Sequence, residues 1–204
     1  DGDAPQGILP LLIEARRRVA AIGHPDAAAK LSEIDEAIAM AAGLWLDVSV
    51  NTSEAVRGQR VNLQLTAVSR LATGLRLESA SVDGVGSDTS LTDAPVELPR
   101  NIAVTRTAQL TIPGSAPLTQ PYWLREAPKG ALYTVSPDDD HSLPEAAPPL
   151  VARFKLNAGG ETIELTRPVE YRYVDRLRGE MTKPFAVVAP VSTRITSAAV
   201  LFPN

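Results

Sequence analysis

The chain has 204 residues, a formal net charge of −4 and no cysteine. The absence of cysteine excludes disulfide bonds, thiolate metal sites and a cysteine nucleophile. The basic residues are scattered apart from Arg16, Arg17 and Arg18, which disfavours nucleic acid as a partner. No apolar run approaches the roughly 20 residues that a bilayer requires, so we expect no membrane insertion.

Two amphipathic helices are predicted at the start of the chain. The first has an apolar stripe at helical spacing, formed by Ile8, Leu9, Leu12, Val19 and Ile22. A second stripe follows the turn at residues 23–25 and consists of Ala27, Leu31, Ile34, Ile38 and Ala41. Gly43 can supply the left-handed residue that ends this helix. We therefore predict a helical hairpin over residues 1–43, with its three consecutive arginines on a solvated face.

From residue 44 onward the apolar period changes from that of a helix to that of a strand. Leu44, Leu46, Val48 and Val50 alternate with Trp45, Asp47 and Ser49. Further strand segments are predicted over residues 61–67, 75–82, 102–112, 151–156, 162–173 and 185–188. Short strands separated by turns predict a mainly β fold, an immunoglobulin-like antiparallel β-sandwich over residues 44–190.

Two stretches do not fit the strand pattern. Residues 113–149 hold eight prolines, so we expect this segment to cross the end or edge of the sheets. Residues 191–204 are interpreted as a linker and the start of a following β domain, because the apolar run 198–202 looks like a beginning strand. The chain starts at Asp1 without an initiator methionine, and we expect both ends to be cuts from a larger protein.

The densest aromatic segment reads Thr-Gln-Pro-Tyr-Trp-Leu over residues 119–124. Tyr122 and Trp123, beside Gln120 and Arg125, could stack on a sugar or a peptide. The two rings could equally fill the core, where each would bury about 150 to 250 Å². We favour the core interpretation and keep these four residues as the candidate ligand site.

Catalytic and metal chemistry has few candidate residues. Asp138, Asp140 and His141 are weak metal candidates, but they lack the spacing of a dedicated calcium loop, and a solvated turn is favoured. With His24 and His141 as its histidines, the chain is poorly equipped for a triad or a multi-histidine zinc site. A carboxylate pair of the glycosidase type stays open, because any two acids can meet in space.

Much of the chain resembles the non-catalytic segment that follows the catalytic domain in long bacterial N-acetylglucosaminyl deacetylases of the PIG-L or LmbE-like family. The resemblance rests on the helical start at residues 9–16, Gly-Leu-Trp-Leu at 43–46, the segment 119–124, and residues 168–180. That family's zinc-binding His-Pro-Asp-Asp segment is absent. His24, Pro25 and Asp26 stand between two predicted helices and are interpreted as a helix start.

The resemblance implies a fragment of an exported protein, periplasmic or secreted, between an upstream deacetylase domain and a downstream β domain. We expect a non-catalytic spacer or scaffold without a cofactor. A carbohydrate-binding module for envelope glycans and a cryptic hydrolase are the alternatives. The partners expected are the two neighbouring domains and possibly a glycan, but not nucleic acid.

Overall fold

The computed structural model describes residues 4–85, 87–92, 94–135 and 145–193. As predicted, this part of the chain is mainly β, with a helical hairpin at its start. The helical segments are η1 (Pro5–Ile8), α1 (Leu9–Ala20), α2 (Ala27–Ala41) and η2 (Tyr122–Leu124). The strands are β1 (Leu44–Val50), β2 (Glu54–Ala55), β3 (Arg60–Ser69), β4 (Arg76–Gly84), β5 (Ser87–Thr92), β6 (Val96–Glu97), β7 (Val104–Thr111), β8 (Leu150–Ala158), β9 (Glu161–Pro168), β10 (Glu170–Asp175), β11 (Gly179–Pro184) and β12 (Ala186–Val187).

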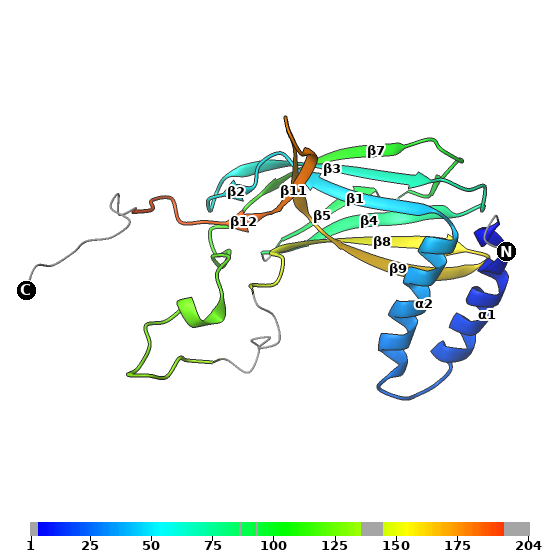
Figure 1. Cartoon of the computed structure of the whole chain (residues 1–204), viewed down its shortest axis with the longest axis horizontal. Helices are drawn as coiled ribbons and strands as arrows, with labels where there is room; N and C mark the ends of the chain where they lie inside the picture. Colours follow the sequence, from blue (N-terminus) through cyan, green and yellow to red (C-terminus); the bar gives the residue numbers. More distant parts are fainter. Residues whose placement is uncertain (1–3, 86, 93, 136–144, 194–204) are drawn as a thin grey trace, which may run out of the picture.

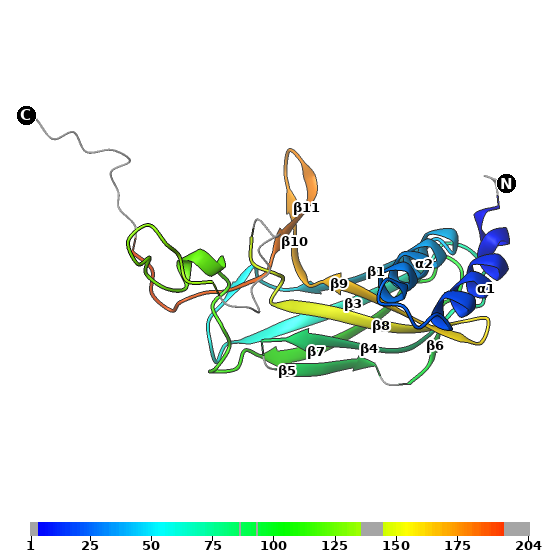
Figure 2. The same ribbon diagram turned by 90° about the horizontal axis from the view of Figure 1, so that it is seen from below.

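The strands build two larger sheets in the described part of the chain. One has the order β11-β10-β1-β3-β7, and the other has the order β5-β4-β8-β9 with β6 beside β4. The inward faces of both sheets share one hydrophobic core, whose largest fully buried side chains include Phe154, Phe185, Leu65, Leu77 and Ile163. Figures 1 and 2 show the two layers running along the longest axis of the molecule.

The pairing is not purely antiparallel, which corrects the antiparallel prediction. β1 pairs antiparallel with β3 along the whole of β1, but β1 and β10 pair parallel at Ser49↔Glu170 and Val50↔Tyr171. β2 and β12 are also parallel. Because β10 contacts β1 over so short a register, the β10–β11 hairpin diverges from the sheet and projects from it (Figure 2).

The helical hairpin agrees with its sequence pattern in α2 more than in α1. Ile38 and Ala41 of α2 are buried, and Gly43 has the left-handed φ of +60° that ends the helix. In α1, Leu9 is buried, but the predicted stripe positions Ile8 and Ile22 are 48% and 55% exposed. Both lie outside α1, so the apolar stripe is shorter than the spacing predicted.

The predicted continuous strand over residues 162–173 is wrong. The structure divides it into β9 and β10, which belong to different sheets. Pro168 ends β9, where it has no N–H to donate to a ladder, and the buried Val169 donates its N–H to the Leu150 carbonyl at 3.0 Å. The chain therefore crosses from one sheet to the other at residues 168–170.

The proline-rich segment avoids the sheets, as predicted, in its described parts at residues 113–135 and 145–149. It extends at the end of the molecule opposite the helices (Figure 1). The predicted linker and following strand at residues 194–204 lie outside the described residues. None of the described helices has the length and apolar character needed to cross a bilayer.

Candidate functional site

The four predicted ligand residues lie in and around η2. Tyr122 and Trp123 contact each other edge to face, with ring centroids 5.1 Å apart and ring planes at 86°. Both rings are half-buried, and neither belongs to the hydrophobic core. The expectation that they fill the core is therefore wrong, because η2 lies in the segment outside the sheets and its rings pack on each other.

A cavity of about 490 Å³ lies beside η2 but does not gather all four residues. Gln120 lines it, together with Pro121 and the β11–β12 junction at Pro184 and Phe185. Tyr122, Trp123 and Arg125 are not among its lining residues. Thr119 ties this side of the cavity to β12. Its N–H donates to the Val187 carbonyl and its Oγ1 accepts from the Val187 N–H, both at 2.9 Å.

The structure gathers no cluster of three or more metal-ligating side chains within the described ranges. The weak metal candidates Asp138, Asp140 and His141 lie outside those ranges. His24 is exposed in the turn between the helices, and its Nδ1 accepts the Asp26 N–H at 3.2 Å. Asp26 occupies the N-cap of α2, where its side chain makes no capping hydrogen bond.

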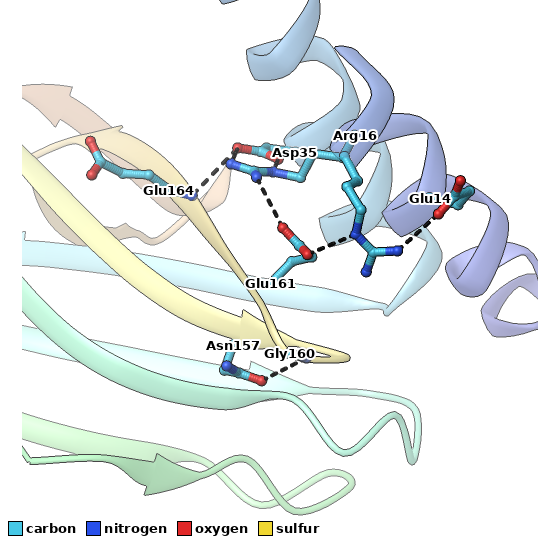
Figure 3. A network of polar contacts seen from close by, with 8 residues as sticks. Glu14, Arg16, Asp35, Asn157, Gly160, Glu161 and Glu164 are labelled. Atoms are coloured by element: carbon cyan, nitrogen blue, oxygen red, sulfur yellow. Dashed lines mark hydrogen bonds and ion pairs between the residues drawn. The ribbon is translucent and has the colours of Figure 1, made fainter. Parts of the chain in front are cut away.

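A network of ion pairs fastens the helical hairpin together. Arg16 of α1 donates from Nε to Oδ1 of Asp35 on α2 at 2.6 Å, and these side chains are 15% and 6% exposed. The backbone N–H of Glu164 on β9 donates to the other carboxylate oxygen of Asp35 at 3.4 Å. Asp35 therefore links α1, α2 and β9 (Figure 3). The prediction that all three arginines are solvated is wrong for Arg16.

Further ion pairs tie both helices to the same strand. Arg17 donates from Nε to Glu161 on β9 at 3.0 Å, and this hydrogen bond with the attraction of the carboxylate raises the Arg17 pKa. Arg167 of β9 makes a bidentate pair with Glu36 of α2, at 2.6 and 2.9 Å. The whole set, which we call the β9 clamp, comprises Arg16, Arg17, Asp35, Glu36, Glu161, Glu164 and Arg167.

A second polar region lies on the outer face of the β1-β3-β7 sheet. Many outward positions there carry uncharged polar side chains: Ser49, Asn62, Gln64, Thr66, Thr105, Thr107 and Gln109. Arg60, Trp45, Asp47 and Val68 occupy other outward positions of β1 and β3. The Gln109 amide Nε2 donates to Asn62 Oδ1 across the strands at 3.1 Å. A groove of about 310 Å³ opens on this face and is lined by Ser49, Asn51, Asn62, Gln64, Thr107, Tyr171 and Arg172, with Val50 and Leu63.

The projecting β10–β11 hairpin forms one wall of this groove. Arg172 leaves β10 toward the outer sheet face, where it donates to Asp47 at 2.8 Å and lies 5.7 Å from the centroid of the Trp45 ring. It also bonds Glu180 on β11. Burial opposes the charge of Arg172, but the bonds to Glu180 and Asp47 outweigh this effect and raise its pKa. The groove wall is therefore held by paired charges.

Comparison with known proteins leaves the chain without an assigned family. No family model matches it, and no curated protein matches it at a significant level. Similar solved structures include a Northeast Structural Genomics Consortium target, SoR45, with a TM-score of 0.36 and 9% identity over 78% of this chain and 97% of that one. Another is the alkylpurine DNA glycosylase AlkC of Pseudomonas fluorescens, bound to DNA containing an abasic site analog, with a TM-score of 0.29 and 13% identity.

A β-glucosidase from Listeria innocua in complex with isofagomine has a TM-score of 0.24 and 15% identity. This chain spans 43% of the glycosylase and 16% of the glucosidase, while 82% and 62% of this chain are covered. At these TM-scores the likenesses carry no argument about this chain.

Sequence reasoning missed the polar groove on the outer face. A signal was present, since the outward positions of Val-Asn-Leu-Gln-Leu-Thr at residues 61–66 are all uncharged polar residues. What the sequence could not indicate is that β10 would diverge from β1 and form a wall beside them.

Proposed function

We propose that the chain is a non-catalytic accessory module whose role is to act as a rigid spacer. The observation that carries this proposal is the β9 clamp. It joins the helical hairpin to one sheet through charged contacts on both α1 and α2. A hairpin held at several points cannot move independently of the sheets. The module therefore keeps one fixed orientation between its helical end and its sheets.

Packing supports the same role. The hairpin contributes Leu9, Ile38 and Ala42 to the hydrophobic core that the two sheets share. A methyl group built on Gly159, at the β8–β9 turn, would lie 3.1 Å from Cδ1 of Ile13 on α1. This close approach brings the turn directly against the first helix. Charged contacts and apolar packing therefore both hold the helical hairpin against the β8–β9 region.

The shape of the module suits a spacer. The described chain begins at the helical end, and its last described residues lie toward the opposite end of the longest axis (Figure 1). A segment attached before α1 and one attached after β12 would therefore be held apart by the length of the sheets. In a parent protein of the PIG-L type, as the sequence resemblance suggests, the module would hold an exported deacetylase domain at a set distance from a following β domain.

We further propose that the two sheets form a variant of the immunoglobulin-like sandwich. The shared core between two layers supports this proposal, and the parallel β1–β10 and β2–β12 pairings are the departures from an all-antiparallel version. A strand that changes sheets, as the chain does between β9 and β10, is compatible with a two-layer β architecture.

The spacer proposal is tested by a distance measurement across the module. The chain has no cysteine, so Gly7→Cys with Ala189→Cys introduces two unique spin-label sites. Pulsed electron resonance should give one narrow distance distribution, and adding Arg17→Ala with Glu36→Ala should broaden it. A broad distribution in the intact chain would contradict the proposal.

The non-catalytic part of the proposal is tested separately. The purified chain, supplied with zinc, should release no acetate from N-acetylglucosamine oligomers, with an active zinc deacetylase as the positive control. Metal-dependent deacetylation by the chain would contradict this part, provided that the activity co-purifies with the chain and is absent from a mock preparation.

A further inference from the structure

We propose that the outer face of the β1-β3-β7 sheet, at the corner with the β10–β11 hairpin, is a binding site for a neutral polysaccharide. This site is distinct from the Gln120, Tyr122, Trp123 and Arg125 region. It also goes beyond the spacer role, which does not depend on it. The proposal rests on the composition of the face, the shape of the corner and the charge balance of its wall.

The composition favours a ligand rich in hydroxyl groups. Amide side chains both donate and accept hydrogen bonds, and hydroxyl side chains do the same, so the face matches the mixed donors and acceptors of a sugar. Within the described residues, no side chain or backbone group hydrogen-bonds to the Gln64 amide or to the hydroxyl of Ser49 or Thr107. Asn62 is held by Gln109 and by its own N–H bond to Asn51 Oδ1 at 2.8 Å. The face therefore offers polar side chains that are available to a ligand, beside Asn62, whose position is fixed by hydrogen bonds.

The corner makes this face concave. Tyr171 lines the groove from β10, where it packs against the hydrophobic core and stacks on Tyr173 with centroids 5.7 Å apart and planes at 10°. Its fixed position holds the β10 wall of the groove in place. The groove volume of about 310 Å³ is at the lower end of the range for ligand sites.

The charge balance of the groove disfavours a strongly anionic ligand. Arg172 is the cationic side chain among the lining residues, and Asp47 and Glu180 already bond it. A sulfated or carboxylated chain would find no uncommitted cation in this groove, and two acids lie close behind the wall. A neutral ligand avoids this cost.

The continuation of the face favours a polymer over a single sugar. Beyond the groove, Thr66, Thr105 and Gln109 continue the uncharged polar surface across β3 and β7, and Arg60 bounds it at the start of β3. A saccharide chain entering at the corner can therefore continue over the same kind of surface. Each additional sugar would add hydrogen bonds of modest net value, about 0.5 to 1.5 kcal/mol each.

Affinity electrophoresis of the whole chain tests the proposal. The probes are the neutral polymers laminarin, galactomannan and arabinoxylan, with heparin and polygalacturonate as charged comparisons. At least one neutral polymer should retard the chain, and the charged polymers should not. Gln64→Ala with Thr107→Ala should weaken the dissociation constant by about tenfold, as expected for losing two such hydrogen bonds.

The matched control is Thr162→Ala with Thr166→Ala, which removes exposed polar groups from β9 in the other sheet. It should leave retardation unchanged, and thermal melts should show that both variants are folded. Absence of retardation by every neutral polymer, retardation by charged polymers alone, or equal weakening in both double variants would overturn the proposal. None of these results bears on the spin-label distances that test the spacer role.

Discussion

Arg16 and Asp35 form an ion pair in which both partners are largely withdrawn from water, across the interface of the two helices. Asp35 is also one of the points at which β9 bonds the hairpin, through the Glu164 N–H. A carboxylate in such a position is stable only while it stays paired, because an uncompensated buried charge is costly.

We expect Arg16→Ala to destabilise the chain by about 3 to 5 kcal/mol, the range for removing one partner of a buried pair. Chemical denaturation of the variant measures this loss. The matched control is Arg18→Ala, because Arg18 is 78% exposed and pairs with Glu14 on the surface. That change should cost no more than about 0.5 kcal/mol. Equal losses in both variants would contradict the special role of Asp35.

Gly84 at the end of β4 allows no side chain. It has a φ of +132°, and a methyl group built on it would lie 2.0 Å from the Pro149 carbonyl oxygen. We expect Gly84→Ala to cost more than about 1 kcal/mol, since the backbone is strained and β4 must separate from β8.

Gly114→Ala is the comparison for this glycine, because nothing lies within 4 Å of a methyl group there. Its melting temperature should remain close to that of the parent chain. If Gly84→Ala had the same melting temperature as Gly114→Ala, β4 and β8 would be able to separate at that position at little cost in stability.

Trp123 lies outside the core, so its truncation should be mild. Trp123→Ala removes the edge-to-face contact with Tyr122, and we expect a loss of about 0.5 to 1.5 kcal/mol. Thermal melts of this variant are compared with those of Phe154→Ala, which removes a fully buried ring. We expect that control to lose about 3 to 5 kcal/mol. A loss of the same size for Trp123→Ala would show that the Trp123 ring is part of the hydrophobic core.

Asp175 makes the tip of the β10–β11 hairpin sensitive to acid. The N–H groups of Arg178 and Leu177 donate to its carboxylate and lower its pKa below the ordinary value of 3.8. A lowered folded pKa means that this stabilisation is present above the unfolded value and disappears as the pH falls through the folded value.

The amide NMR signals of Leu177 and Arg178 should therefore titrate at a pH below 3.8. In Asp175→Asn the two signals should lose this titration, because the side chain no longer ionises. Midpoints at or above the ordinary carboxyl value would contradict the bonding of Asp175 to the two amides.

The parts of the fold that sequence predicts best are those with strong periodicity. In β3, and in β1 from Leu46 onward, every second residue is buried, as the alternation of Leu46, Val48 and Val50 indicates. β5 and β11 escaped prediction because Ser-Asp-Thr-Ser-Leu-Thr and Gly-Glu-Met-Thr-Lys-Pro show no apolar alternation. These strands form through pairing with β4 and β10, which is tertiary context that propensity does not contain.

The candidate sites show the same division. Arg16 was interpreted as solvated because a run of arginines usually is, and only the docking of α2 reveals that Asp35 faces it. The aromatic segment stands out in the sequence, but the separation of its rings from the core depends on η2 lying outside the sheets. The outer-face groove depends on where β10 leaves β1, which no local pattern records.

The parallel pairing of β2 with β12 has a mechanical consequence. If the chain were pulled at both ends, the force would reach β2 along the chain by way of β1 and pull β2 toward the helical end. β12 would be pulled toward the opposite end. Parallel strands loaded in this way slide past each other, so that their hydrogen bonds share the force instead of opening one by one. The register is short, Ala186↔Glu54 and Val187↔Ala55, so we expect this contact to act as a weak first latch that yields before the sheets do.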